Sequence, residues 1–443
     1  MKKLNIFAME IKCPSLDKER IRVFDNLREA EYEWPDRLFH RVITNKINFN
    51  FEYNNVSSLQ ELKKFSDNNI PYVVFVKFYE FRQIVGKRLE EKEDEKLSLM
   101  HYLFSSKDNQ FIIDDINSDK CKFIIAGLTE LSNQDYRLSF SIFNKQIKKY
   151  NLDESKITFF DWINNIEHMK KYNQNIKFKY FNWLMVSWNH YLNFPKTHKF
   201  FSKHYRKQKR FISLNHSIKL HRFLLIDFLR KKDLYKLGFI SFFHKKFKQE
   251  FFDDAKALGW TKKEANEFYE WLNLNPLSVD IDLDYDYQTK LETNSSAPNE
   301  IFNEKTDKAY RDSYFNILTE TCFFDGSYEQ MDEYYLNERN VLPINTFQPF
   351  IVLNGKGHMK QFNRLGFKSF HPYIDESYDS EKEPSKRFKM VTKEIERLCH
   401  MSDDEIHDWY WSMEEILIHN YNHFHNEFLP KQIQGFYDEL IFE

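Results

Sequence analysis

The sequence predicts an α/β protein of two domains, and three observations support this fold class. The chain has 443 residues, which is enough for two or three domains of about 100–200 residues each. Short apolar runs rich in β-branched and aromatic residues alternate with longer polar stretches of helical periodicity, a pattern typical of parallel sheets covered by helices. The charge changes near Pro195, where a strongly basic segment begins, and we place the domain boundary there.

Composition narrows the class of protein. Lys and Arg number 65 against 67 Asp and Glu, a formal net charge of -2, which argues against a protein that binds nucleic acid through a large basic excess. The four cysteines are dispersed and form no Cys-x-x-Cys pair, which favours a reducing compartment. The first apolar run, 4–9, is too short for a signal sequence, and no run reaches the ~18–20 apolar residues of a membrane span. We therefore expect a cytoplasmic protein without a transmembrane segment.

Glycine is scarce, with 9 residues in the chain. Dinucleotide-binding loops of the G-x-G-x-x-G kind and Walker loops of the G-x-x-x-x-G-K kind both need clustered glycines, and neither pattern occurs. The only close pair is Gly355-Lys356-Gly357. A G-x-S-x-G nucleophile elbow is absent as well, so the sequence gives no support for a serine hydrolase.

The basic segment 196–232 holds 12 Lys or Arg and one acid, and it contains the best phosphate-binding candidate that the residues alone provide. A predicted strand (210–214) leads through a loop to a predicted helix (220–231). Backbone N–H groups at a helix N-terminus attract anions, and Arg222 in the first turn could add a bidentate guanidinium. The alternative is that Arg222 is an exposed helical arginine and Asn215 a turn residue.

The segment Asn-Glu-Arg-Asn at 337–340 precedes a predicted apolar helix and is a second candidate. Glu338 could hold ribose hydroxyls and Arg339 a diphosphate, whereas the alternative is a solvated surface ion pair. Two further patterns suggest metal sites, the alternating aspartates of 280–286 and the i, i+4 pair His419 and His423. An exposed edge strand and a helix surface explain these patterns better, so we expect no metal site.

The order of these motifs resembles a group of bacterial and phage-encoded glycosyltransferases whose donor half is similar to that of α1,3-fucosyltransferases. The resemblance spans about residues 210–397. Its most specific part is 348–379, with the strings Gln-Pro-Phe-Ile-Val, Leu-Gly-Phe-Lys-Ser-Phe and Ile-Asp-Glu-Ser-Tyr-Asp. Leu-Thr-Glu-Thr (318–321) and the Glu-Arg pair before Pro-Ile are less specific.

The resemblance implies a GT-B-like fold, with two Rossmann-like domains facing across a cleft and C-terminal helices. We expect an N-terminal acceptor-side domain (1–195), a nucleotide-sugar donor-binding domain (196–397) and a helical extension (398–443). The implied activity is metal-independent, needs no cofactor and transfers a sugar from a nucleotide-sugar to a glycan, a protein or a nucleic acid. The residues carried over to the donor site are Asn215, Arg222, Thr321, Glu338 and Arg339.

An inverting transfer needs a base, and an acid at the carboxyl end of a parallel strand is well placed for that role. The runs 4–9, 72–78, 111–113 and 122–126 are the predicted strands of the N-terminal domain. The acids that follow them are Glu10, Glu80, Asp114, Asp115 and Glu130. The pattern does not choose between them.

Two other functions remain open at this stage. The family string is Thr/Ser-Glu-Lys-Thr, and Arg339 keeps the charge of its lysine but loses the compact point contact. The chain could therefore be a catalytically inactive binding or assembly module with a retained fold. Alternatively, the basic segment could face nucleic acid, with DNA bases as the glycosylated acceptor.

Overall fold

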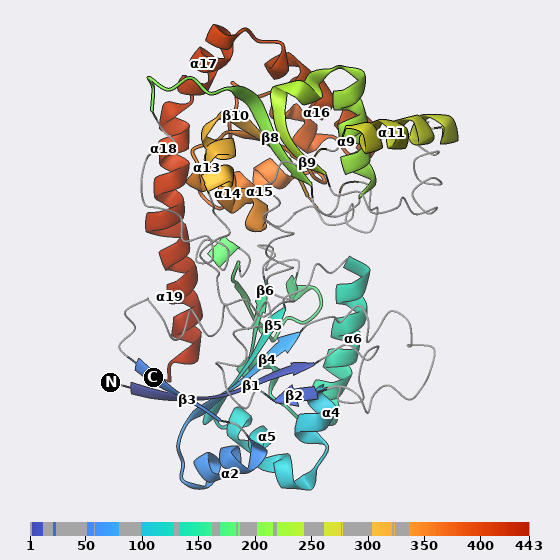
Figure 1. Ribbon diagram of the computed structural model, residues 1–443. Coiled ribbons are helices and arrows are strands. Elements are labelled where there is room, and N and C mark those ends of the chain that lie inside the picture. Colours follow the sequence, from blue (N-terminus) through green and yellow to red (C-terminus); the bar gives the residue numbers. More distant parts are fainter. Residues whose placement is uncertain are drawn as a thin grey trace. The chain divides into compact units, whose positions relative to one another are not determined.

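The computed structural model describes residues 2–11, 21–23, 51–56, 58–78, 99–127, 133–161, 169–182, 185–186, 202–215, 219–242, 261–275, 277, 304–320, 323 and 336–442. The chain divides into two compact units, Met1–Val186 with Pro430–Glu443, and Ser187–Leu429 (Figure 1). Each unit is described by itself.

Unit 1 is built on a sheet of seven described strands. They are β1 (Lys2–Ile11), β2 (Ile21–Val23), β3 (Phe51–Asn55), β4 (Tyr72–Phe78), β5 (Cys121–Gly127), β6 (Ile157–Asp161) and β7 (Lys177–Tyr180). The order is β2-β1-β4-β5-β6-β7, with β3 paired to β1, and every pair is parallel except β1 with β2. The helices are α2 (Leu59–Asp67), α4 (Leu99–Phe104), η3 (Lys107–Asn109), α5 (Gln110–Asn117), α6 (Asn133–Lys149), η4 (Glu154–Lys156) and α19 (Leu429–Leu440).

The apolar runs of unit 1 form its central strands because both faces of the sheet are covered. In β4, four consecutive residues, 73–76, are at most 4% exposed. The C-terminal helix α19 adds to this core through Phe436, whose ring contacts Phe160 and Phe181 with centroids 4.9 Å away in each case. The last residues of the chain therefore belong to the core of unit 1.

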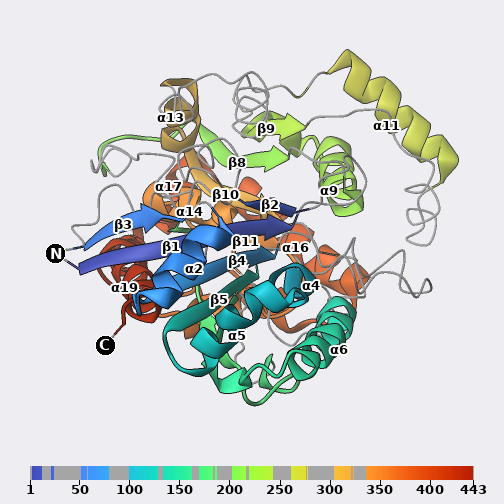
Figure 2. The ribbon, with the colours of Figure 1, turned by 90° about the horizontal axis from the view of Figure 1, so that it is seen from below.

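The strand predicted at 111–113 is wrong, because these residues lie in helix α5, which packs beside β5 (Figure 2). A run of three apolar residues does not distinguish a strand from one turn of a buried helix. The buried positions of α5 are Ile112, Ile113, Asp115 and Ile116, which is a helical face.

The described residues of unit 2 form a sheet of four parallel strands in the order β11-β10-β8-β9. They are β8 (Lys209–Asn215), β9 (Gly238–Phe242), β10 (Ser313–Thr319) and β11 (Phe350–Leu353). The first helices are α9 (Leu220–Lys231), η6 (Leu234–Leu237), α11 (Lys262–Leu274), α13 (Glu304–Arg311), η8 (Glu338–Asn340), α14 (Val341–Asn345) and α15 (His358–Arg364). After them come η9 (Glu376–Ser380), α16 (Pro384–Cys399), α17 (Asp403–Trp411), α18 (Glu414–His423) and the π-helical η10 (Phe424–Phe428).

The predicted fold class is confirmed, since each unit is an α/β unit on a largely parallel sheet and helices close the chain. The sequence Ser-Asp-Asp-Glu at 402–405 fits a capping box. The structure has this capping box, formed by Ser402 and Glu405, at the start of α17. The domain boundaries at 195 and 397 remain predictions. Within the described residues, no helix is long and apolar enough to cross a membrane.

Candidate functional site

The topology of unit 2 indicates where a ligand can bind. β8 and β10 are neighbours in the sheet, although β9 lies between them in the sequence and pairs with the other side of β8. The connections of such a sheet leave to opposite faces at this point and open a crevice outside the carboxyl ends of the two strands, which is where ligands bind in open α/β sheets. The candidate site is therefore at the carboxyl ends of β8 and β10.

Asn215 ends β8 and ties it to β10. The side chain is 1% exposed. Its Oδ1 accepts a hydrogen bond from Thr319 Oγ1 at 2.7 Å, and its Nδ2 donates to Ser213 Oγ at 3.1 Å. The alternative that Asn215 is a turn residue is wrong, because it is the last residue of the strand. It holds the two strand ends together beneath the candidate site.

Arg222 lies in the first turn of α9 and is fully buried, with an exposed fraction of 0%. Its Nη2 donates to the carbonyl oxygen of Thr319, the last residue of β10, at 2.8 Å. The alternative of an exposed helical arginine is therefore wrong. A buried guanidinium keeps its charge, so Arg222 fixes a positive charge at this strand end.

Arg339 reaches the neighbouring strand end from η8. Its backbone N–H donates to Asn337 Oδ1 at 2.9 Å, and its Nη1 donates to the carbonyl oxygen of Leu214 at 3.2 Å. Leu214 lies one residue before the end of β8. The structure thus brings the predicted residues Arg222 and Arg339 to adjacent strand ends, although 117 residues separate them in the sequence (339 − 222).

The pKa of His221 is sensitive to the positive charges of this region. Its ring is buried and its Nε2–H donates to the carbonyl oxygen of Glu320 at 2.8 Å. Burial lowers the pKa of His221 well below its usual value, and the charges of Arg222, Lys219 and Arg339 lower this pKa further. The imidazole is therefore neutral, and the crevice has a cationic environment.

Sequence reasoning did not select His221, Glu320 or Asn337 as site residues. Glu320 directly follows β10, is 2% exposed, and accepts a hydrogen bond from Asn337 Nδ2 through Oε2. The sequence signal for Glu320 is an acid directly after an apolar run, which is the same signal that selected the acids of the N-terminal domain. The contact with Asn337 could not be predicted, because it depends on where η8 lies.

Among the described residues of unit 2, two helices begin soon after a parallel strand, and their N-termini differ. At α15, the carboxylate of Asp379 accepts hydrogen bonds from the backbone N–H groups of Met359 and Lys360, both at 3.0 Å. At α9, the N-cap residue Lys219 makes no side-chain cap hydrogen bond. A protein carboxylate thus occupies the N-terminus of α15, and the N-terminus of α9 is the better place for an anionic ligand.

The remaining predicted site residues are placed as follows. Glu338 is the first residue of η8. Glu10 is the ninth residue of β1, in register with Lys77 of β4. The described residues do not include Thr321, Glu80, Glu130 or the aspartates of 280–286.

Asp114 and Asp115 lie on helix α5, so the strand-end argument for a catalytic base does not apply to them. Asp114 is exposed. Asp115 is 4% exposed and accepts a hydrogen bond from the hydroxyl of Tyr72 at 2.8 Å. Tyr72 is the first residue of β4, so Asp115 lies at the amino end of that strand, away from the edge where ligands bind in such sheets.

His419 and His423 use their Nε2 atoms within the protein. The Nε2 atom of His419 lies 3.0 Å from the carbonyl oxygen of Gly366. The Nε2 atom of His423 lies 2.7 Å from the carbonyl oxygen of Leu365. A carbonyl oxygen only accepts, so both nitrogens carry hydrogen, and the pair holds the turn after α15. No group of three or more His, Cys, Asp or Glu that could hold a metal ion occurs among the described residues.

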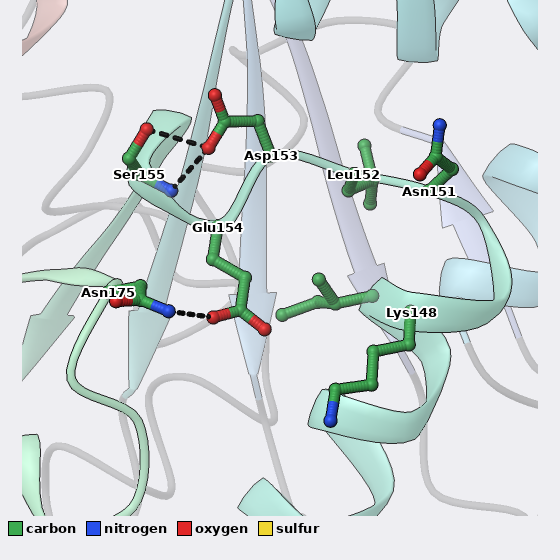
Figure 3. A pocket seen from close by; sticks show the side chains of 8 residues that line it. Lys148, Asn151, Leu152, Asp153, Glu154, Ser155 and Asn175 are labelled. Carbon is green, nitrogen blue, oxygen red and sulfur yellow. Dashed lines mark hydrogen bonds between the residues drawn. The ribbon is translucent and has the colours of Figure 1, made fainter.

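Unit 1 has an open hollow of about 670 Å³ between the end of α6 and η4 (Figure 3). Several polar groups that line it form hydrogen bonds with each other. The carboxylate of Asp153 accepts from the backbone N–H of Ser155 at 3.0 Å, and the carboxylate of Glu154 accepts from the side-chain amide of Asn175 at 2.7 Å. The hollow adjoins the amino end of β6. Ligands of parallel sheets bind at the opposite ends of the strands, so this hollow is not the candidate site.

A scan against protein-family models and a search of curated proteins found no match. Among solved structures, the chain is similar to an α,α-trehalose-phosphate synthase (UDP-forming) from Burkholderia vietnamiensis, with 8% identity, a TM-score of 0.42 and 99% of each chain covered. The N-terminal domain of trehalose-6-phosphate phosphatase from Candida albicans has 10% identity and a TM-score of 0.42, with 99% of this chain and 96% of that chain covered. These values are too low to transfer a site or an activity to this chain.

Proposed function

We propose that the chain is a glycosyltransferase that uses a nucleotide-sugar, and that the donor diphosphate binds at the carboxyl ends of β8 and β10. One observation carries this proposal. Arg222 and Arg339 come from distant segments, yet each donates to a main-chain carbonyl at the end of one of the two strands, at Thr319 and at Leu214. Two cations at one crevice suit a ligand with two phosphate groups.

The chemistry of sugar transfer uses such a site. An acceptor oxygen bonds to the anomeric carbon, the bond from that carbon to the diphosphate breaks, and the bonding electrons leave with the diphosphate. Negative charge therefore builds up on the leaving group. Arg222, Arg339 and the N-terminus of α9 are fixed positive groups that stabilise this charge without reorganisation. The acceptor proton passes to a base.

Within this proposal, Glu338 binds a hydroxyl group of the ribose or the sugar. It precedes Arg339 in η8, so a ligand whose phosphate contacts Arg339 has its sugar part within reach of this turn. Arginine in place of lysine offers two parallel N–H groups to a phosphate, which favours a defined geometry over a point contact.

The basic segment gives little support to nucleic acid as the acceptor, because acidic groups of the same chain neutralise several of its charges. These pairs are Lys203–Glu414, Arg206–Asp404, Arg210–Asp403, Arg230–Asp227, Lys231–Asp227 and Lys232–Glu396. A cation already paired in this way releases fewer counterions when it meets a phosphate backbone.

Nucleotide binding tests the proposal directly. The purified chain is heated with GDP, UDP, CDP or ADP, or the corresponding nucleotide-sugars, without added metal. A ligand at 100 times its Kd contributes about 2.7 kcal/mol to stability, which is visible as a rise in Tm. We expect a rise with one nucleotide family.

Variants locate the binding site. Arg339→Ala should reduce the rise in Tm. Arg222→Lys keeps the buried charge but removes the planar guanidinium, so it should reduce the rise in Tm as well. Arg206→Ala is the matched control, because this arginine lies in the same basic segment but pairs with Asp404 at the surface. No rise with any nucleotide would refute the proposal and favour an inactive module. A rise that survives both site variants would show that the nucleotide binds elsewhere.

A further inference from the structure

We propose that His358 is a positioning residue for the donor site, which acts through Asn340 and Asn337 to hold the η8 turn that carries Arg339. This inference rests on the proposed function, because it assigns Arg339 to the diphosphate. His358 is the first residue of α15 and does not belong to η8 or to the strand ends that Arg222 and Arg339 contact.

The three side chains form a buried relay. His358 and Asn340 are 0% exposed, and Asn337 is 1% exposed. His358 Nε2 lies 3.0 Å from Asn340 Oδ1, and Asn340 Nδ2 lies 3.4 Å from Asn337 Oδ1. At the end of the relay that is closest to β10, Asn337 Nδ2 donates to Glu320, the residue after this strand. The relay therefore runs from the start of α15 through η8 to the end of β10.

Backbone N–H groups fix the direction of the relay at both ends. The N–H of Gly355 donates to Asn354 Oδ1 at 2.8 Å, so Asn354 turns its Nδ2 toward His358 Nδ1, 2.9 Å away. His358 Nδ1 therefore accepts, and its Nε2–H must donate to Asn340. At the other end, the N–H of Arg339 donates to Asn337 Oδ1, which leaves Asn337 Nδ2 for Glu320.

The ring keeps this role over the working range of pH. Burial lowers the pKa of His358 to about 3, so the imidazole is neutral and Nδ1 remains an acceptor. A neutral ring also adds no charge next to Asn340 of η8. The geometry thus points to a fixed orienting group.

The turn needs such support. η8 has three residues, and a single short 3-10 turn makes few hydrogen bonds of its own. Arg339 must stay near the end of β8 to share a ligand with Arg222. Asn337 and Asn340 flank the two proposed ligand groups, Glu338 and Arg339, and the relay fixes both of these asparagines.

A double-mutant cycle measured by calorimetry with GDP, UDP, CDP and ADP separates this role from a general effect on stability. His358→Leu removes the donor at similar volume and should weaken nucleotide binding about tenfold, the effect expected for one buried hydrogen bond. His358→Gln places an amide N–H near the position of Nε2 and should keep most of the affinity. In an Arg339→Ala background, His358→Leu should cause no further loss, because its effect passes through Arg339.

A second measurement needs no ligand. Amide hydrogen exchange of 337–341 should be faster in His358→Leu and in Asn340→Ala, which breaks the same link from its other side, but not in His358→Gln. His407→Leu is the matched control, because it removes a histidine hydrogen bond to Tyr314 elsewhere in unit 2. It should change neither the exchange of 337–341 nor nucleotide affinity.

The outcomes distinguish this inference from the function on which it rests. A wild-type chain that binds none of GDP, UDP, CDP and ADP refutes the proposed donor site, and this inference with it. A wild-type chain that binds, with the same loss from His358→Leu in both backgrounds, refutes the positioning role alone. Unchanged exchange of 337–341 in both His358→Leu and Asn340→Ala refutes it as well.

Discussion

Lys207 is a buried lysine whose loss should change how stability depends on pH. The residue is 8% exposed, its Nζ donates to the carbonyl oxygen of Arg311 at 2.9 Å, and it lies 5.0 Å from the centroid of the Tyr410 ring. Burial lowers the pKa of Lys207 to about 7; the charge of Asp312 opposes this shift, and the charge of Arg311 adds to it.

The sign of the pH effect follows from proton counting. A lysine in the unfolded chain has a pKa of about 10.4, so between pH 7 and pH 10 the unfolded state binds more protons at this position than the folded state. Stability therefore rises with pH in this range, by at most about 1.4 kcal/mol per pH unit for this group. Because the folded-state group is half protonated near pH 7, the gain between pH 7 and pH 9 is about 2 kcal/mol.

Urea unfolding of the wild-type chain and of Lys207→Met at pH 7, 8 and 9 measures this gain. Other titrating groups are common to both proteins and cancel in the difference. We expect the stability of the wild-type chain relative to Lys207→Met to increase by about 2 kcal/mol from pH 7 to pH 9. The matched control is Lys209→Met, which removes a half-buried lysine two residues away whose Nζ donates to the carbonyl oxygen of Lys236. If the difference in stability between the wild-type chain and Lys207→Met does not change with pH, the inference that burial lowers the pKa of Lys207 is refuted.

Three substitutions test the local geometry of single residues by thermal unfolding. Gly366→Ala should lower stability by about 1–3 kcal/mol, because φ is +94° and the new Cβ would lie 2.5 Å from His423 Cε1; an unchanged Tm would contradict this. Asp379→Ala should cost about 1–2 kcal/mol through loss of the carboxylate that accepts from backbone N–H groups in the first turn of α15, with Asp379→Asn as the milder control. Asn151→Gly should raise stability by up to about 1 kcal/mol, because φ is +54° there, and a loss of stability would oppose the left-handed conformation.

The sequence predicted most elements whose ends carry strong local signals. The strand 72–78 and the helix 220–231 have the predicted bounds in the structure. Each is a long periodic or continuous apolar run between polar segments. The run 111–113 lacked such length, and its burial against β5 decided its conformation.

The candidate site was less predictable because its geometry depends on contacts between distant segments. The motifs selected Arg222 and Arg339 as charged residues near a helix start and a turn. Their partners, the carbonyl oxygens of Thr319 and Leu214, lie 97 and 125 residues away. The burial of Arg222 follows from the order of the strands, which local patterns do not contain. The hydrogen bonds that link His358 to Asn340 and Asn337 could not be predicted for the same reason.

The scarcity of glycine has a structural consequence at the ends of the helices. A helix often ends on a residue in the left-handed region, which glycine adopts at no steric cost. Here α2, α5, α6, α9 and α14 are each followed, two residues after the last helical residue, by another residue with positive φ: Asn69, Asp119, Asn151, Asp233 and Phe347. Asn and Asp tolerate this region best after glycine.

The two remaining cases show what decides the residue at such a helix end. Phe347 is neither Asn nor Asp, but its ring stacks on Tyr421 at 4.6 Å and its carbonyl oxygen accepts a hydrogen bond from Tyr410, so tertiary contacts offset the local cost. After α15 the chain keeps a glycine, Gly366, because His423 packs where any Cβ would lie. His423 also binds the carbonyl oxygen of Leu365 in this turn. A glycine-poor chain thus keeps glycine where close packing excludes a side chain, and uses Asn or Asp where only the backbone conformation must be met.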